Sequence, residues 1–155
     1  MLTNSNKTLF SLLLCTLLFS GPQALAADGR LSSQSGEMPL VTLKINDQIL
    51  HIEYAATLAL RSVGLMHRTS LCQNCGMLFK FDNPRRVSMW MKDTFIPLDV
   101  AFIRSDGLIT DIKALKPQDL THISASEKIL FALEMNRGWF KRHGITVGGT
   151  LQIEP

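Results

Sequence analysis

The chain of 155 residues lacks the sequence motifs of the common enzyme classes. It has no G-x-S-x-G nucleophile elbow, no H-E-x-x-H zinc motif and no glycine-rich phosphate-binding loop. Its four histidines are scattered, and none has the spacing of a metal site: His51, His67, His122 and His143. These absences argue against a metal, a cofactor or a familiar catalytic mechanism, although they do not exclude an enzyme.

Concentrated charge of one sign is also missing. The chain has 16 Lys and Arg against 13 Asp and Glu, a formal net charge of +3. Nucleic-acid binding needs a concentrated basic face, because the phosphate backbone dominates affinity. Arg85-Arg86 and Lys141-Arg142 are isolated basic pairs. We therefore expect no nucleic-acid partner.

Long apolar runs are absent after the first 26 residues. Leu9 to Ser20 is a twelve-residue apolar run that follows Lys7 and precedes Ala24-Leu25-Ala26. This is the order of regions in a secretory signal peptide, and the run is shorter than the ~20 residues that cross a bilayer. Residues 1–26 are thus predicted to be a cleaved signal peptide. The protein is expected to be exported, periplasmic or secreted, without a membrane span after cleavage.

The segments after the signal predict one tether and one domain. Residues 27–39 are polar and rich in Gly and Ser, which is typical of a flexible tether. Residues 40–155 have the length of a single domain, which we expect to be monomeric.

Alternation of apolar and polar residues predicts about eight short strands in this domain. They are expected at 41–46 and 50–54 (a hairpin), 77–81, 87–91, 100–104, 108–113, 129–135 and 150–154. Two short helices are predicted, over 58–63 after the capping residue Thr57 and over 137–143 before Gly144. This pattern indicates a mostly β domain with a minor α component, either a small sandwich or a squashed barrel with two short helices.

The order of several short motifs resembles the family called Domain of Unknown Function 192. The matching residues are Arg61, Gly64-Leu65-Met66, Arg68, Gly76-Met77-Leu78-Phe79, Trp90-Met91-Lys92, Thr94, Pro97-Leu98-Asp99, Phe102-Ile103, Gly107, Ala132-Leu133-Glu134, Gly138, Gly144-Ile145 and Gly148. The resemblance implies a compact β fold of jelly-roll-like character, often exported in bacteria. It brings no catalytic assignment. Cys72, Cys75 and Met89 depart from the family pattern.

Four charged residues stand among apolar neighbours: Arg61, Lys92, Asp99 and Glu134. Buried charges must be paired, so one interpretation is a structural ion-pair network. The other is a cleft that binds a small molecule or peptide, with apolar lining from Trp90, Met66 and Met77. A binding module is our first hypothesis. An acid–base enzyme of hydrolase type using Lys92, Asp99 and Glu134 is the alternative.

Met89 and Met91 would share a face if they lie on one strand. Two thioethers suit Cu(I), so a soft-metal carrier is a third hypothesis. Methionine also fills irregular cores and contacts aromatic rings, and we favour that interpretation.

Cys72 and Cys75 are the only cysteines outside the predicted signal peptide. An even count in an oxidising compartment predicts a disulfide. A zinc site would need two more ligands, and no second CxxC or paired histidine is present. The pair precedes a predicted strand rather than opening a helix, so a structural disulfide is favoured over a redox-active one.

Overall fold

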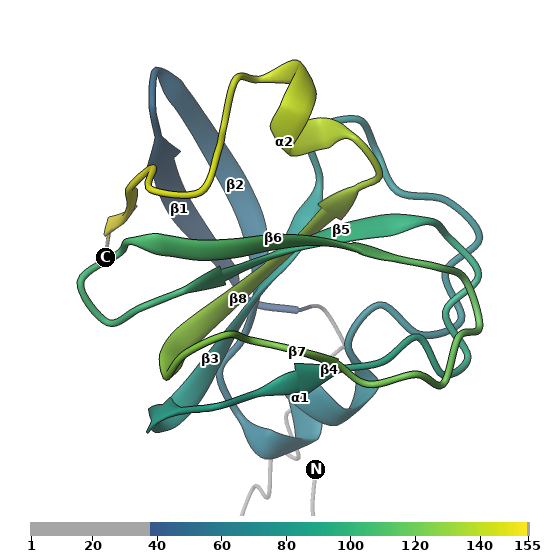
Figure 1. Ribbon diagram of the computed structural model, residues 1–155. Helices are drawn as coiled ribbons and strands as arrows, with labels where there is room; N and C mark the ends of the chain where they lie inside the picture. The colour runs from purple at the N-terminus through teal and green to yellow at the C-terminus, as the bar shows by residue number, and fades with distance from the viewer. Residues whose placement is uncertain (1–37, 155) are drawn as a thin grey trace, which may run out of the picture. The chain divides into compact units, whose positions relative to one another are not determined.

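The computed structural model describes residues 38–154. The predicted signal peptide and most of the predicted tether lie outside the described residues. The elements, in chain order, are β1 (Leu40–Ile45), β2 (Gln48–Ala55), α1 (Leu58–Val63), β3 (Gly76–Arg85), β4 (Ser88–Met89), β5 (Leu98–Ile103), β6 (Ile109–Leu115), β7 (Ile123–Ser124), β8 (Ile129–Asn136), α2 (Trp139–Arg142) and β9 (Leu151–Glu154) (Figure 1). None of the helices in this range is long and apolar enough to cross a membrane.

Seven strands form one curled sheet in the order β6-β5-β8-β3-β2-β1-β9. Only β2 and β3 pair in parallel among the neighbours in this sheet, and the other pairs are antiparallel. The bridge between Leu108 and Thr150 joins the ends of the two edge strands, so the sheet curls into a half-barrel. The prediction of a mostly β fold with two short helices is confirmed.

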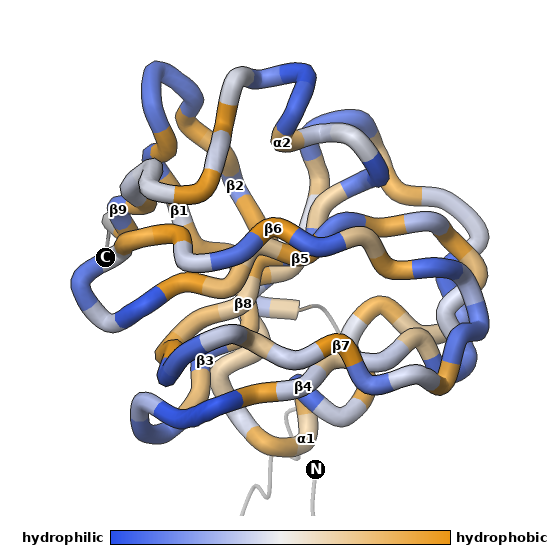
Figure 2. The backbone as a smooth tube through the Cα atoms, in the orientation of Figure 1, coloured by the Kyte–Doolittle hydropathy of each residue, from blue (hydrophilic) through white to orange (hydrophobic). Residues whose placement is uncertain are grey.

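The two faces of the sheet carry separate hydrophobic clusters, because successive side chains on a strand point to opposite faces. The inner cluster draws residues from both edge strands, including Ile109 and Leu151, and also contains Trp139 and Phe140 of α2. The outer cluster contains Met77, Phe79, Val100, Phe102 and Ala132, and segments outside the sheet cover it. In Figure 2 the central strands β5 and β8 are mostly apolar, whereas the β1–β2 turn is hydrophilic.

Some element boundaries differ from those predicted. β3 continues through Pro84 to Arg85, although the predicted strand ended at residue 81. Proline cannot donate to a strand ladder, and the β3–β8 register is irregular between Lys80 and Arg85, where Pro84 is accommodated. The strand expected over 87–91 is only Ser88–Met89.

The strand β7 was not predicted from the sequence. Ile123–Ser124 pairs with β4 in a separate two-stranded ribbon, where Ser88 and Ser124 also join their hydroxyls at 2.8 Å. A strand of two residues is too short to show an alternation of apolar and polar residues.

Candidate functional site

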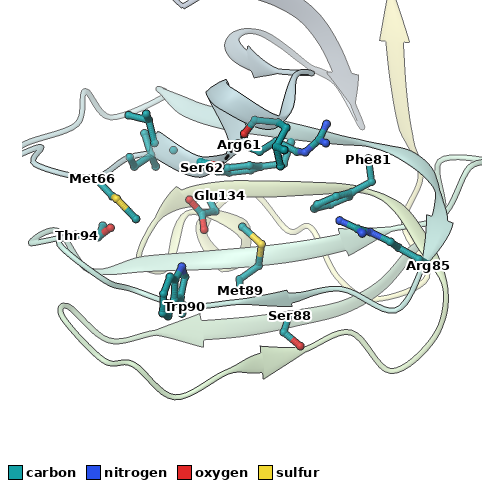
Figure 3. Close-up of a pocket in the computed structure, with 15 residues that line it drawn as sticks. Arg61, Ser62, Met66, Phe81, Arg85, Ser88, Met89, Trp90, Thr94 and Glu134 are labelled. Atoms are coloured by element: carbon teal, nitrogen blue, oxygen red, sulfur yellow. Dashed lines mark hydrogen bonds between the residues drawn. The ribbon is translucent and has the colours of Figure 1, made fainter.

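A pocket of about 300 Å³ lies over the outer face of the sheet. Its walls come from α1 and the turn after it (residues 58–66), from β3, from residues 88–90 and 94, and from Glu134 of β8 (Figure 3). Exposed Leu58, Val63 and Trp90 stand among the lining residues, so the pocket opens to solvent.

Glu134 is the polar group at the base of this pocket. Strand register places it between Met77 of β3 and Val100 of β5, both buried members of the outer cluster. Its exposed fraction is only 4%. Burial raises the pKa of this carboxyl to about 8, from an ordinary value of 4.5. Glu134 is therefore mainly protonated at neutral pH.

No hydrogen bond or ion pair within residues 38–154 involves the Glu134 side chain. Every fully enclosed side-chain nitrogen or oxygen in this range has a partner, so the carboxyl oxygens must reach the pocket space. Figure 3 shows the carboxyl group directed into the space between Met66 and Met89. A buried carboxyl that faces the pocket space is available to a ligand.

Arg61 fixes the helical wall of the pocket. Thr57 caps α1 by accepting a hydrogen bond from the backbone N–H of Leu60 at 3.2 Å. Arg61 then donates to the backbone oxygens of Ala56 (2.8 Å) and Lys80 (2.7 Å), which ties α1 to β3. Its other nitrogen lies 3.3 Å from the Asp82 carboxylate. The guanidinium is thus largely occupied by contacts within the fold.

A second guanidinium lies at the same end of the pocket. Arg61 and Arg85 stand over the ring of Phe81, with their guanidinium carbons 5.6 and 5.3 Å from its centroid. Arg85 is exposed and forms no ion pair with any described residue. The Arg85 end is therefore basic, whereas the Glu134 base is mainly uncharged at neutral pH.

Trp90 forms the opposite rim. Its ring stacks on His122, with centroids 5.6 Å apart, and the ammonium of Lys92 lies 5.9 Å from its centroid. These two contacts hold an exposed tryptophan in place at the pocket edge.

Four of the predicted site residues line this pocket: Arg61, Met66, Trp90 and Glu134. The other three do not. Met77 is fully buried in the outer cluster. Lys92 borders a separate surface hollow with Asp93, Gln118 and Leu120, which it shares with Trp90.

Asp99 lies on the opposite face of the sheet from Glu134. Val100 is the register partner of Glu134 and shares its face, so the preceding residue points the other way. The Asp99 carboxylate accepts from the backbone N–H of Gly138 at 2.7 Å and lies 3.1 Å from Nε of Arg137. It therefore holds the turn between β8 and α2. The enzyme hypothesis required Lys92, Asp99 and Glu134 to converge on one pocket, and they do not.

Sequence reasoning did not select Phe81 and Arg85 for the site. The Arg85-Arg86 pair was interpreted only as isolated surface charge, and no local signal distinguishes its two members. Only the packing of β3 against α1 shows that Arg85 lines the pocket while Arg86 does not.

The two methionines considered for copper lie in different surroundings. Met89 is half-buried and lines the pocket, whereas Met91 is 2% exposed and packs in the outer cluster. This arrangement fits the core-packing interpretation of Met91. Within residues 38–154, no cluster of three or more His, Cys, Asp or Glu side chains could hold a metal.

Cys72 and Cys75 are joined in a disulfide, as predicted. The loop that carries them is also bound to the C-terminal end of β8 and to α2. Asn136 donates to the backbone oxygen of Cys72 at 2.7 Å, and the indole N–H of Trp139 donates to Asn74 at 3.0 Å. Several independent contacts thus hold this loop in the position that leads into β3.

Comparison with known proteins places this architecture in a family. The model of the DUF192 family, described as "Uncharacterized ACR", matches residues 41–153. The chain belongs to the DUF192 family. No curated protein matches it.

Two solved structures are similar to this DUF192 chain. One is a candidate transcription regulator from Sinorhizobium meliloti 1021, with 37% identity and a TM-score of 0.69 over 74% of this chain and 92% of that chain. The other is a protein of unknown function from Novosphingobium aromaticivorans DSM 12444, with 33% identity and a TM-score of 0.68 over 74% of this chain and 84% of that one. Both likenesses support the β fold.

Proposed function

We propose that this protein is an exported binding module that takes up a small, largely apolar molecule in the pocket above Glu134. The observation that carries the proposal is the Glu134 carboxyl, which is 4% exposed at the base of the pocket and has no hydrogen-bond partner among residues 38–154. Burying a carboxyl without a hydrogen-bond partner is unfavourable, and glutamate is rarely fully buried unless paired. A ligand that hydrogen-bonds to Glu134 would supply the missing partner.

The protonation state of Glu134 defines what it offers. With a pKa raised to about 8, it is mainly a neutral acid at pH 7. A neutral carboxyl both donates and accepts a hydrogen bond. The surrounding Met66, Phe79 and Met89 supply apolar contact area. This combination of apolar walls with a few placed polar groups is typical of small-molecule sites.

The acid–base enzyme is the second candidate, because a pKa near neutrality suits proton transfer. It would need a different partner from those first predicted. Lys92 and Asp99 lie outside the pocket, and Arg61 is occupied by contacts with the fold. Binding is therefore the better supported function.

The description of the Sinorhizobium relative does not extend readily to this chain. A regulator that binds DNA needs a concentrated basic face, whereas this chain has a net charge of only +3. The proposal of export rests on the sequence of residues 1–26 alone. Mass analysis of the protein recovered from the periplasm or medium would show whether that segment is removed.

Methyl NMR can test binding at this pocket directly. Met66 and Met89 line the pocket, Met91 packs beside it, and Met135 belongs to the inner cluster on the other face. We would label the methionine methyl groups with carbon-13 and titrate the purified protein with a mixture of small organic acids, amides and alcohols. Binding in the pocket should shift the Met66 and Met89 signals and leave Met135 unchanged. Compounds that shift none of these signals, or that shift Met135 equally, would contradict the proposal.

A further inference from the structure

The basic end of the pocket defines the class of ligand more narrowly. We infer that the pocket accepts an apolar monocarboxylate, whose carboxylate lies against Arg85 and whose body extends over Met89 to a neutral hydrogen-bonding group at Glu134. This inference rests on the proposed function, since it names the ligand of the same pocket.

The two arginines at this end are not equivalent. Arg61 donates hydrogen bonds to Ala56, Lys80 and Asp82, and its side chain is only 8% exposed. Arg85 lies over the ring of Phe81, the same ring that Arg61 contacts. It has no carboxylate partner in residues 38–154. Figure 3 shows its guanidinium turned toward Phe81, at the end of the pocket away from Trp90. Stacking on an aromatic ring leaves the edge donors of a guanidinium free for a carboxylate.

The rest of the lining selects against a cation. Two guanidiniums stand at one end of the pocket, and the Lys92 ammonium lies over the Trp90 ring at the other. Asp82 already pairs with Arg61, so Arg85 is the guanidinium without an ion-pair partner among residues 38–154. No ionised carboxylate among the lining residues offsets Arg85, because Glu134 is mainly neutral. An ammonium group would enter an unfavourable potential, whereas an organic acid would enter a favourable one.

Apolar contact area lies between the two polar ends. Phe81 and Met89 lie between the Arg85 end and the Glu134 base (Figure 3), and Phe79 also lines the pocket. A linear or aryl body with a carboxylate at one end and a neutral hydrogen-bonding group, such as a hydroxyl, at the other matches this order of groups. A ligand with a second acidic group at Glu134 would meet an apolar surround instead of a counter-ion.

Three probes with one body test the inference: 4-(4-hydroxyphenyl)butanoate, 4-(4-hydroxyphenyl)butanamide and 4-(4-hydroxyphenyl)butylamine. Each is titrated into the purified protein at pH 7 and followed by the Met66 and Met89 methyl signals. The carboxylate should bind most tightly, by roughly fivefold over the amide, as expected for a solvent-exposed charge pair. The amine should bind most weakly.

The Arg85→Gln variant should remove the preference for the carboxylate over the amide. Arg86→Gln is the matched control, because it makes the same charge change at an exposed neighbour outside the pocket. It should keep the preference.

The outcomes separate the two proposals. Equal affinity for carboxylate and amide, tightest binding of the amine, or equal loss of the preference in both arginine variants would overturn the monocarboxylate assignment while leaving a binding pocket. Failure of all three probes to shift Met66 or Met89, in a protein that does respond to other small molecules, would also overturn the assignment alone. An absence of response to every compound would contradict both proposals.

Discussion

Two strand carboxyl groups on opposite faces of one sheet have different environments. Asp99 of β5 is 9% exposed and Glu134 of β8 is 4% exposed, and they belong to adjacent strands. Asp99 accepts from Gly138 and pairs with Arg137 beside α2. Glu134 has neither a hydrogen-bond partner nor a counter-ion in the described fold. Burial alone therefore does not distinguish a structural carboxyl from a candidate site; its partners do.

The two carboxyl groups also affect the stability of the fold in opposite ways. A paired carboxylate at a turn stabilises the fold that positions its partners. An unpaired carboxyl in an apolar pocket destabilises the folded protein whenever the unfolded chain would ionise it. Residues that oppose stability are common where function requires them, which is consistent with a ligand site around Glu134.

The largest expected effect is on Glu134. Its folded pKa of about 8 exceeds the ordinary value of 4.5, so the native state holds a proton that the unfolded state releases between these pH values. The contribution of Glu134 to stability should accordingly be most favourable below pH 4.5 and become less favourable as pH rises toward 8. At pH 7, Glu134→Gln should raise the free energy of unfolding by about 3 kcal/mol relative to the wild type, with little difference at pH 4.

Chemical denaturation at pH 4 and pH 7 checks this prediction. Glu127→Gln serves as the control, because Glu127 is an exposed glutamate and should show no such pH-dependent gain. If wild type and Glu134→Gln have the same dependence of stability on pH, the Glu134 carboxyl is solvated and the contrast with Asp99 disappears.

The second prediction concerns the partnered carboxyl. Asp99→Asn should lower the free energy of unfolding by about 2 kcal/mol, because it removes the charge that faces Arg137 and weakens the bond from Gly138. The partial exposure of Arg137 keeps the expected loss below that of a fully buried pair. Thermal unfolding measures it. The Met66 and Met89 methyl signals should be unchanged, and a shift in them would link the two carboxyl sites that we describe as separate.

The disulfide lies in the loop that contacts Asn136 and Trp139, close in sequence to the Asp99 partners Arg137 and Gly138, and it does not line the pocket. Closing so short a loop contributes at most about 2 kcal/mol in the chain-entropy model, and Asn136 and Trp139 hold the loop independently. The Cys72→Ser/Cys75→Ser variant should therefore stay folded with a modest loss of stability. Mass analysis with and without reductant tests the bond, and an insulin-reduction assay tests redox activity. Free thiols in the native protein, or turnover in that assay, would refute a structural role.

The smallest expected effect is on copper binding. Met89 lines the pocket while Met91 packs in the outer cluster, so we expect Cu(I) to bind the wild type no more tightly than a Met89→Leu/Met91→Leu variant. Competition with a chelating dye measures both affinities. A large loss of affinity in the variant would support the soft-metal hypothesis. It would also mean that the pocket face of the sheet binds a metal.

Local patterns predicted the elements well where they were long enough to show a period. Alternation located the β1–β2 hairpin, β5, β6 and β8, and a cap with a C-terminal glycine located α1. The two-residue β7 could not be found this way, and Pro84 did not end β3 because the sheet accommodates an irregular register. Short elements depend on contacts with distant parts of the chain.

The candidate site was predictable only in part. Arg61, Met66, Trp90 and Glu134 were selected as charged or amphipathic residues among apolar neighbours, and all four line the pocket. The same criterion selected Asp99, which the alternation of β5 places on the other face. Alternation within one strand showed which residues share a face of that strand. It could not show which of the two faces carries the pocket.

The sequence by itself determined the family, the mostly β class and the pairing of Cys72 with Cys75, because motif order, period-two alternation and a short cysteine spacing are local properties. Tertiary structure decided the environment of each charge. The register of β8 against β3 and β5 places Glu134 among apolar side chains, and the packing of α1 on β3 brings Arg85 to the same pocket. Those relations join residues far apart in the chain, and the free energy of burying a charge depends on its neighbours in space rather than in sequence.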